Sequence, residues 1–260
     1  SLNSQPELEM GGGEARSDGS FSTPPKPRPV NVRKVIVLDP GHGGVDPGAS
    51  GRKAKEKNVV MTFSKELSQQ LKSAGYEVHM TRTKDVYIPL HERVQKARRK
   101  NADLFISVHA DAIKKKNVRG LSIYTLSEKA SDKEAAALAR KENQSDIIAG
   151  IDFADHPPEI ANILIDLTQR ETKNLSVRFA KNVVSEAGKE TKLLERTHRF
   201  AGFRVLKAPD VPSVLVELGF LTNRSDEKQL LSSTWRKSVA KSLVRAVDIY
   251  FDEKKKRALQ

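Results

Sequence analysis

Three short apolar runs in this chain end on, or just before, a residue that can bind a metal ion or move a proton. Those residues are His42, His109 and Glu217, and the runs span residues 35–38, 104–108 and 214–216. Apolar runs of this length predict buried strands, and in an open α/β sheet ligands bind outside the carboxyl ends of the strands. We therefore expect one functional edge of a sheet, where two imidazoles and several carboxylates gather.

The chain contains no cysteine, so disulfides, thiolate ligands and cysteine nucleophiles are excluded. Histidines and carboxylates remain, and together they outline a site for a borderline-soft divalent ion, most simply zinc. A catalytic zinc ion uses three protein ligands and keeps one position open for water. His42 and His109 are the natural pair. Glu56, just ahead of an expected helix, is placed to be the third ligand.

Each of these residues also has a structural interpretation. A single histidine after a strand is more often a structural side chain, and Glu56 could complement the dipole of the helix that it precedes. Asp39 and Asp46 could be turn residues. Glu217 is harder to explain in this way, because an unpaired carboxylate at the end of an apolar strand is costly. It suggests a metal, a charged partner or a carboxyl group with a raised pKa and a task.

The elements that must position these residues follow from hydrophobic periodicity. From residue 33 onward, strand patterns alternate with helix patterns, which predicts one α/β domain over residues 33–257 with a mostly parallel central sheet of about six strands and helices on both faces. The expected strands are 34–39, 76–82, 103–109, 119–126, 203–207 and 213–218. The expected helices include 59–74, 89–100 and 235–251.

Residues 1–32 are rich in Gly, Ser and Pro, which predicts a flexible linker that tethers a further domain. Lys and Arg number 46 against 33 Asp and Glu, a formal net charge of +13. That charge would attract nucleic acid, anionic lipid headgroups or an acidic wall polymer. We do not expect nucleic acid, because the basic residues are scattered and only 5% of residues are aromatic.

No apolar run approaches the roughly 18 residues of a membrane span, so we expect no transmembrane segment. The N-terminus lacks a signal-peptide pattern. The residues alone therefore leave open a cytoplasmic protein or a mature fragment of a longer precursor.

Residues 128–174 form a longer excursion than a crossover helix requires. A capping box at Ser131 and Glu134 predicts an alanine-rich helix through Glu142. After a break at 150–158, a second helix is expected to carry an apolar stripe made of Ile160, Ile163, Leu164 and Leu167. Insertions of this kind usually regulate or bind.

Four segments resemble the successive signatures of the zinc-dependent N-acetylmuramoyl-L-alanine amidases of the Amidase_3 type. They are VLDPGHGG at 37–44, KEKN at 55–58, SVHAD at 107–111 and PSVLVELGFLTN at 212–223. The resemblance implies that His42, Glu56 and His109 bind one zinc ion per chain and that Glu217 is the catalytic carboxylate. The implied reaction is hydrolysis of the amide between N-acetylmuramic acid and the L-alanine of the stem peptide of peptidoglycan.

The excursion resembles the insertion of the periplasmic cell-division amidases of Gram-negative bacteria. There, a helix carries a glutamate into the zinc site until an activator with a LytM-type domain displaces it. The resemblance implies that Glu142 is the blocking ligand, that the protein is periplasmic and that it splits the septal wall. Without it, a solvated helix residue would be the simpler interpretation, since Glu128, Glu134 and Glu159 are equally available.

The apolar stripe of the second helix, residues 160–167, could dock the inhibitory helix or receive the activator, although packing within the fold is the commoner use. We expect a monomer. Two other functions remain open: a zinc peptidase that cleaves stem-peptide bonds, and a catalytically inactive, basic wall-binding module.

Overall fold

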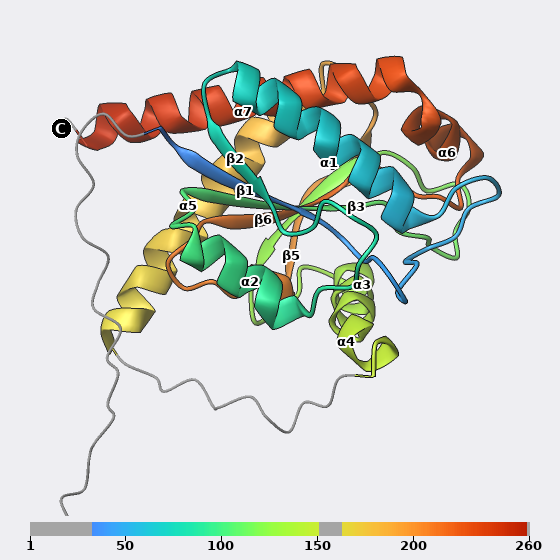
Figure 1. Cartoon of the computed structure of the whole chain (residues 1–260), viewed down its shortest axis with the longest axis horizontal. Helices are drawn as coiled ribbons and strands as arrows, with labels where there is room; N and C mark the ends of the chain where they lie inside the picture. The colour runs from blue at the N-terminus through green and yellow to red at the C-terminus, as the bar shows by residue number, and fades with distance from the viewer. Residues whose placement is uncertain (1–32, 151–162, 259–260) are drawn as a thin grey trace, which may run out of the picture. The chain divides into compact units, whose positions relative to one another are not determined.

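The computed structural model describes residues 33–150 and 163–258, with backbone alone for residues 163–167 and 257–258. The expected linker and Ile160 lie outside the described residues. The described residues form one α/β unit built on a central sheet (Figure 1). Among the described helices, none combines the length and apolar character needed to cross a membrane.

The sheet of the described unit has six strands in the order β2-β1-β3-β6-β4-β5. Their bounds are β1 Val35–Pro40, β2 Glu77–Met80, β3 Leu104–His109, β4 Leu121–Leu126, β5 Leu193–Ala201 and β6 Ser213–Glu217. Neighbouring strands run parallel except β4 and β6, which pair antiparallel. The predicted mostly parallel α/β sheet is therefore confirmed.

Helices cover both faces of this sheet, as predicted. They are α1 Glu56–Ser73, α2 Leu90–Arg99, α3 Lys133–Asn143, α4 Ser145–Ile148, α5 Ile163–Ala187, α6 Arg224–Leu231 and α7 Ser233–Ala258. Side chains of a strand alternate between faces, so Ile36 and Leu38 of β1 join one core with α1, α5 and α7. Val37 belongs to the other core, with α2 and α3. Figure 1 shows α1 and α7 on one side of the sheet and α2 and α3 on the other.

The strand expected at 203–207 is wrong. Residues Arg204–Leu206 form a 3-10 helix, η2, and its apolar pair Val205 and Leu206 fills the second core. The missing strand is β5, which lies at the edge of the sheet and carries half-buried and exposed side chains along most of its length. An edge strand needs no continuous apolar run, so periodicity did not reveal it.

The helix that carries Glu142 begins one residue later than the capping box predicts. Asp132 is the N-cap, and its carboxylate accepts a hydrogen bond from the Ala135 amide at 2.8 Å. Ser131 instead donates its hydroxyl to Asp132. The helix ends at Asn143 and a single turn, α4, follows.

Candidate metal centre

His42 follows β1 in a loop that two buried arginines hold in place. Arg93 donates to the carbonyls of Pro40 and His42, each at 2.9 Å, and Arg82 donates to those of Pro40 and Gly41 at 2.9 and 2.7 Å. His42 has a φ of +59°, a left-handed conformation that a residue with a Cβ adopts only when its surroundings impose it. These hydrogen bonds therefore fix the loop backbone and, with it, the position of the His42 imidazole.

The imidazole of His42 is oriented from its far side. Its Nδ1 lies 2.8 Å from Asp46 Oδ2, and Asp46 Oδ1 accepts the Gly48 amide at 3.0 Å. A carboxylate on one ring nitrogen leaves the other nitrogen free to face a metal ion. Histidines that bind a metal usually have such a carboxylate on their other ring nitrogen. Asp46 is thus more than a turn residue.

Glu56 is the first residue of α1 and is fully buried. Its two carboxylate oxygens accept the backbone amides of Ala110 at 2.9 Å and Ala49 at 2.7 Å, which fix the side chain between β3 and the loop after β1. Gly48 makes this approach possible: a Cβ there would lie 2.6 Å from the His42 ring and 2.7 Å from Glu56 Oε2, and its φ is +64°.

His109 ends β3 directly beside Glu217, which ends β6, in the parallel register of the two strands. Gly41 lets the His109 ring come close to the β1 loop, because a Cβ at residue 41 would lie 2.5 Å from that ring. The rings of His42 and His109 stand edge to face with centroids 4.9 Å apart. The carboxyl ends of β1, β3 and β6 thus meet, as the sequence predicts.

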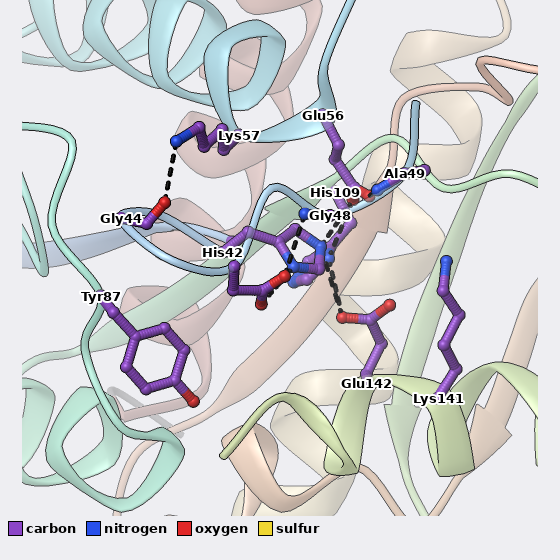
Figure 2. Close-up of polar contacts among 12 residues, drawn as sticks. His42, Gly44, Gly48, Ala49, Glu56, Lys57, Tyr87, His109, Lys141 and Glu142 are labelled. Atoms are coloured by element: carbon purple, nitrogen blue, oxygen red, sulfur yellow. Dashed lines mark hydrogen bonds and ion pairs between the residues drawn. The ribbon is translucent and has the colours of Figure 1, made fainter. Parts of the chain in front are cut away.

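Four of the residues that the sequence assigns to the site converge at one point: His42, Glu56, His109 and Glu142. Glu56 Oε1 lies 3.0 Å from His42 Nε2 and 3.2 Å from His109 Nδ1. Glu142 Oε2 lies 3.6 and 3.2 Å from the same two nitrogens (Figure 2). Ligand atoms of His42, His109 and Glu142 fall within 4.8 Å of one another, so this group could hold a metal ion.

The donor atoms of this cluster fit a bound cation. His42 Nε2 and His109 Nδ1 are buried and make no well-formed hydrogen bond among the described residues; each instead faces carboxylate oxygens of Glu56 and Glu142. Glu142 Oε1 is buried with no hydrogen-bond partner among those residues, although buried polar atoms are nearly always paired. A cavity of about 10 Å³ adjoins the two rings and Glu142. Two neutral imidazoles and carboxylates are a preferred ligand set of zinc.

Electrostatics point the same way. Burial alone would lower the pKa of His42, but the carboxylates of Glu56 and Glu142 outweigh it and raise that pKa well above the ordinary value. Burial would raise the pKa of Glu56, yet His42 and His109 hold it well below its usual range. The cluster therefore attracts positive charge, as a cation site must.

Glu217 lies next to this cluster but makes different contacts. Its Oε2 accepts the Asp111 amide at 3.0 Å, while its Oε1 is buried with no hydrogen-bond partner among the described residues. Burial, followed by the charges of Glu56, Asp111 and Glu142, raises its pKa well above the usual glutamate value. A carboxyl group that can hold a proton at this position suits general acid and base chemistry.

Glu142 comes from the last turn of α3, which docks over the cluster. The helix buries Ala135, Leu138 and Ala139 against the second core. At its end, Asn143 donates to the Gly202 carbonyl and accepts the Arg204 amide, both at 2.8 Å. This packing delivers the carboxylate from the side opposite Glu56 (Figure 2).

Three further polar contacts tie the excursion to the loops around the cluster. Asp146 of α4 accepts the Tyr87 hydroxyl at 2.6 Å and the Leu90 amide at 2.9 Å. Lys141 forms an ion pair with Asp111. Burial, with the charge of Glu56, raises the pKa of the Asp111 carboxyl to about 6 despite this pairing.

Sequence reasoning missed the buried arginines Arg82 and Arg93, which carry no local signal in a chain whose basic residues are scattered. Asp111 lies in the SVHAD segment and Lys141 precedes Glu142. Their positions next to predicted site residues are the signal that could have identified both. The role of the apolar stripe stays a prediction. Ile160 lies outside the described residues, and the structure gives only the backbone of Ile163, Leu164 and Leu167 at the start of α5.

Comparison with known proteins agrees with this geometry. The family model described as N-acetylmuramoyl-L-alanine amidase, Amidase_3, matches residues 36–248. The chain is 41% identical to the amidase AmiC of Escherichia coli O6:H1 over 84% of this chain and 52% of that one. It is 40% identical to AmiC of Neisseria meningitidis serogroup B over 92% of this chain and 58% of that one. The chain thus spans about half the length of these two relatives.

Among solved structures, the amidase AmiC2 of Nostoc punctiforme matches with a TM-score of 0.60 at 25% identity, over 84% of this chain and 97% of that one. The catalytic domain of the amidase CwlV from Bacillus (Paenibacillus) polymyxa var. colistinus matches with a TM-score of 0.60 at 24% identity, over 84% and 98% of the two chains. Both share the fold. With a family model that covers most of the described unit, this chain belongs to the Amidase_3 family of N-acetylmuramoyl-L-alanine amidases.

Proposed function

We propose that the protein is a zinc-dependent amidase of peptidoglycan, which hydrolyses the bond between N-acetylmuramic acid and the L-alanine of the stem peptide. One observation carries the proposal: two buried imidazole nitrogens converge on an oxygen of Glu56 without a well-formed hydrogen bond to it, and Glu217 lies beside them. Family membership supplies the substrate class.

His42, Glu56 and His109 would hold one zinc ion, as the sequence resemblance implies. Bound there, zinc would act as a Lewis acid towards the amide carbonyl and the attacking water. The chain's own contribution is rigidity. Asp46 orients His42, and the amides of Ala49 and Ala110 orient Glu56, so the ligands need no rearrangement.

Glu217 would carry the proton. It takes a proton from the attacking water and returns it to the leaving nitrogen, which requires a carboxyl group that changes protonation state during the cycle. The Asp111 amide fixes one of its oxygens and leaves the other available to substrate. The raised pKa favours return of the proton.

The described conformation would be the inhibited one. Glu142 lies within 3.6 Å of both imidazole nitrogens, where substrate and water must enter, so hydrolysis requires α3 to move away. A partner that binds the excursion would shift the population towards the open state. We propose a LytM-type activator, a periplasmic location and a role in septal wall splitting, all on the resemblance to the Gram-negative cell-division amidases.

The test is digestion of purified sacculi with zinc-loaded Glu142→Ala protein, in which the block is removed, and with the same protein carrying Glu217→Gln as well. Because Glu217 moves the proton, the variant should lose at least about a hundredfold in rate while its zinc content stays unchanged. Mass spectrometry of the digest should find intact stem peptides with a free L-alanine amine. Cleavage within the stem peptide would instead indicate a peptidase. A zinc content near zero after incubation with zinc, or no solubilisation of sacculi even with an activator, would indicate a wall-binding module.

A further inference from the structure

We propose that the carboxylate of Asp111 binds the amine of the departing stem peptide, and that Lys141 and Glu142 occupy the site as a mimic of the two reaction products. This inference rests on the proposed function and adds a substrate-binding residue to it. The carrying observation is a pair of contacts made by consecutive residues of α3.

The two contacts have opposite charge. Glu142 places a carboxylate 3.2 Å from His109 Nδ1, and its neighbour Lys141 places an ammonium group on the carboxylate of Asp111. Figure 2 shows both side chains extending from the end of α3 in the same general direction, with Glu142 reaching the imidazoles and Lys141 beside it. One helix end therefore fills two positions, one for an anion at the imidazoles and one for a cation at Asp111.

Hydrolysis of an amide produces the same pair of charges. The carbon–nitrogen bond breaks, the oxygen of water bonds to the carbonyl carbon, and both protons of water end on the nitrogen. The products are a carboxylate, which stays on the lactyl group of the glycan, and an ammonium group on L-alanine. The carboxylate forms at the metal ligands, so the ammonium forms within a few bonds of it.

Asp111 is built into the site rather than placed on its surface. Asp111 is only 2% exposed. Its amide donates to Glu217 Oε2 at 3.0 Å, and its carbonyl accepts the Leu221 amide at 2.8 Å. A buried carboxylate needs a cationic partner. When α3 leaves, Lys141 leaves with it, and a substrate ammonium can take its place.

Glu217 connects this binding site to the chemistry. Its Oε1 has no hydrogen-bond partner among the described residues, while its Oε2 touches the backbone of Asp111. The residue that would protonate the leaving nitrogen is thus fixed to the residue that would hold the resulting ammonium. This arrangement favours the L-alanine amine over an amine on a later side chain of the stem peptide.

The test measures binding rather than turnover. The Lys141→Met, Glu142→Ala double variant, loaded with zinc, clears both positions. It is titrated by NMR with the dipeptide L-alanyl-D-glutamate, which has no side-chain amine, and with its N-acetylated form. We expect the free dipeptide to bind about 10- to 100-fold more tightly than the acetylated one, as a charge-assisted contact implies. Adding Asp111→Asn should remove that difference.

Equal affinity for the two dipeptides, no binding of the free dipeptide, or an unchanged difference in the Asp111→Asn protein would each overturn the inference. The acetylation arm uses an intact Asp111, so it decides the matter even if Asp111→Asn fails to fold. If the affinity of a longer stem peptide depends only on its side-chain amine, Asp111 binds that amine and not the amine of L-alanine. This result would contradict our assignment. Hydrolysis of sacculi without amine-dependent binding would overturn the inference and leave the proposed function standing. Amine-dependent binding without hydrolysis would contradict the proposed function and leave Asp111 as an amine-binding residue only.

Discussion

At the scale of single residues, the conformation of the loop that carries His42 depends on a buried ion pair between Asp39 and Arg93. Asp39 accepts Arg93 at 2.9 Å, Thr81 at 2.5 Å and Ser107 at 2.8 Å, and the same arginine holds the His42 carbonyl. Burial alone would raise the pKa of Asp39, but Arg93 and the two hydroxyl groups outweigh it and lower that pKa.

The Asp39→Asn variant should therefore lose about 3 kcal/mol in free energy of unfolding at neutral pH, because it leaves a buried arginine unpaired. A carboxyl group whose pKa is lowered in the folded state stabilises above its unfolded value of 3.8 and loses that effect as pH falls through the lowered value. The gap between wild type and variant should shrink accordingly below about pH 4.

Chemical denaturation of both proteins across this pH range, with chelator present so that metal content is equal, checks the prediction. Glu195→Gln, at an exposed position of β5, is the matched control and should change little at any pH. A gap that stays constant down to pH 2 would contradict the role given to Asp39.

Some residues of the site could be predicted from the sequence and others could not. His42, Glu56, His109 and Glu217 could be singled out because they stand at strand ends or a helix start. Arg82 and Arg93 could not, because their task is to satisfy backbone carbonyls of a loop whose path is visible only in three dimensions. Asp46 was weighed as a turn residue, and only the folded loop brings it to the His42 ring.

At the scale of elements, α3 is held over the cluster by packing and by a few polar contacts. The Asn143→Ala variant removes both contacts of that side chain with residues 202 and 204. At about 0.5 to 1 kcal/mol each, their loss should raise the population of the open state, and with it basal hydrolysis of sacculi, by about 5- to 30-fold.

The control for this prediction is Gln144→Ala, which truncates the exposed neighbouring side chain and should leave the basal rate near that of wild type. Dye release from labelled sacculi, measured without an activator, gives the comparison. If both variants match wild type, the contacts of Asn143 do not hold the closed state.

The elements that the sequence predicts well are those with a strong period. β1, β3 and β6 have continuous apolar runs because both faces of each strand are buried. β5 was not predicted, because its edge position leaves most of its side chains half-buried or exposed and so gives no apolar run. The antiparallel direction of β4 also escaped, since an apolar pattern indicates burial and carries no information about direction.

At the scale of the whole molecule, the proposed zinc ion would join segments that are far apart in the sequence. His42 lies in the loop after β1, Glu56 begins α1 and His109 ends β3. A ligand that binds only the folded state stabilises it by mass action, by about 2.7 kcal/mol at a concentration a hundredfold above the dissociation constant. Zinc should therefore stabilise the chelator-treated protein.

Thermal unfolding with and without added zinc measures this effect. His109→Ala should lose most of the stabilisation, whereas His91→Ala, on an exposed position of α2, should keep it. Equal stabilisation of both variants would place the ion elsewhere in the protein.

The central claim is that the site is assembled and then closed by Glu142. The most direct test is the basal rate at which zinc-loaded Glu142→Ala protein releases stem peptides from sacculi without an activator. Removing a carboxylate that blocks the metal ligands should raise that rate by more than about tenfold, the effect of about 1.4 kcal/mol. Glu134→Ala, an exposed carboxylate on the same helix, should leave it unchanged. A folded, zinc-loaded Glu142→Ala protein with the wild-type basal rate would contradict the claim.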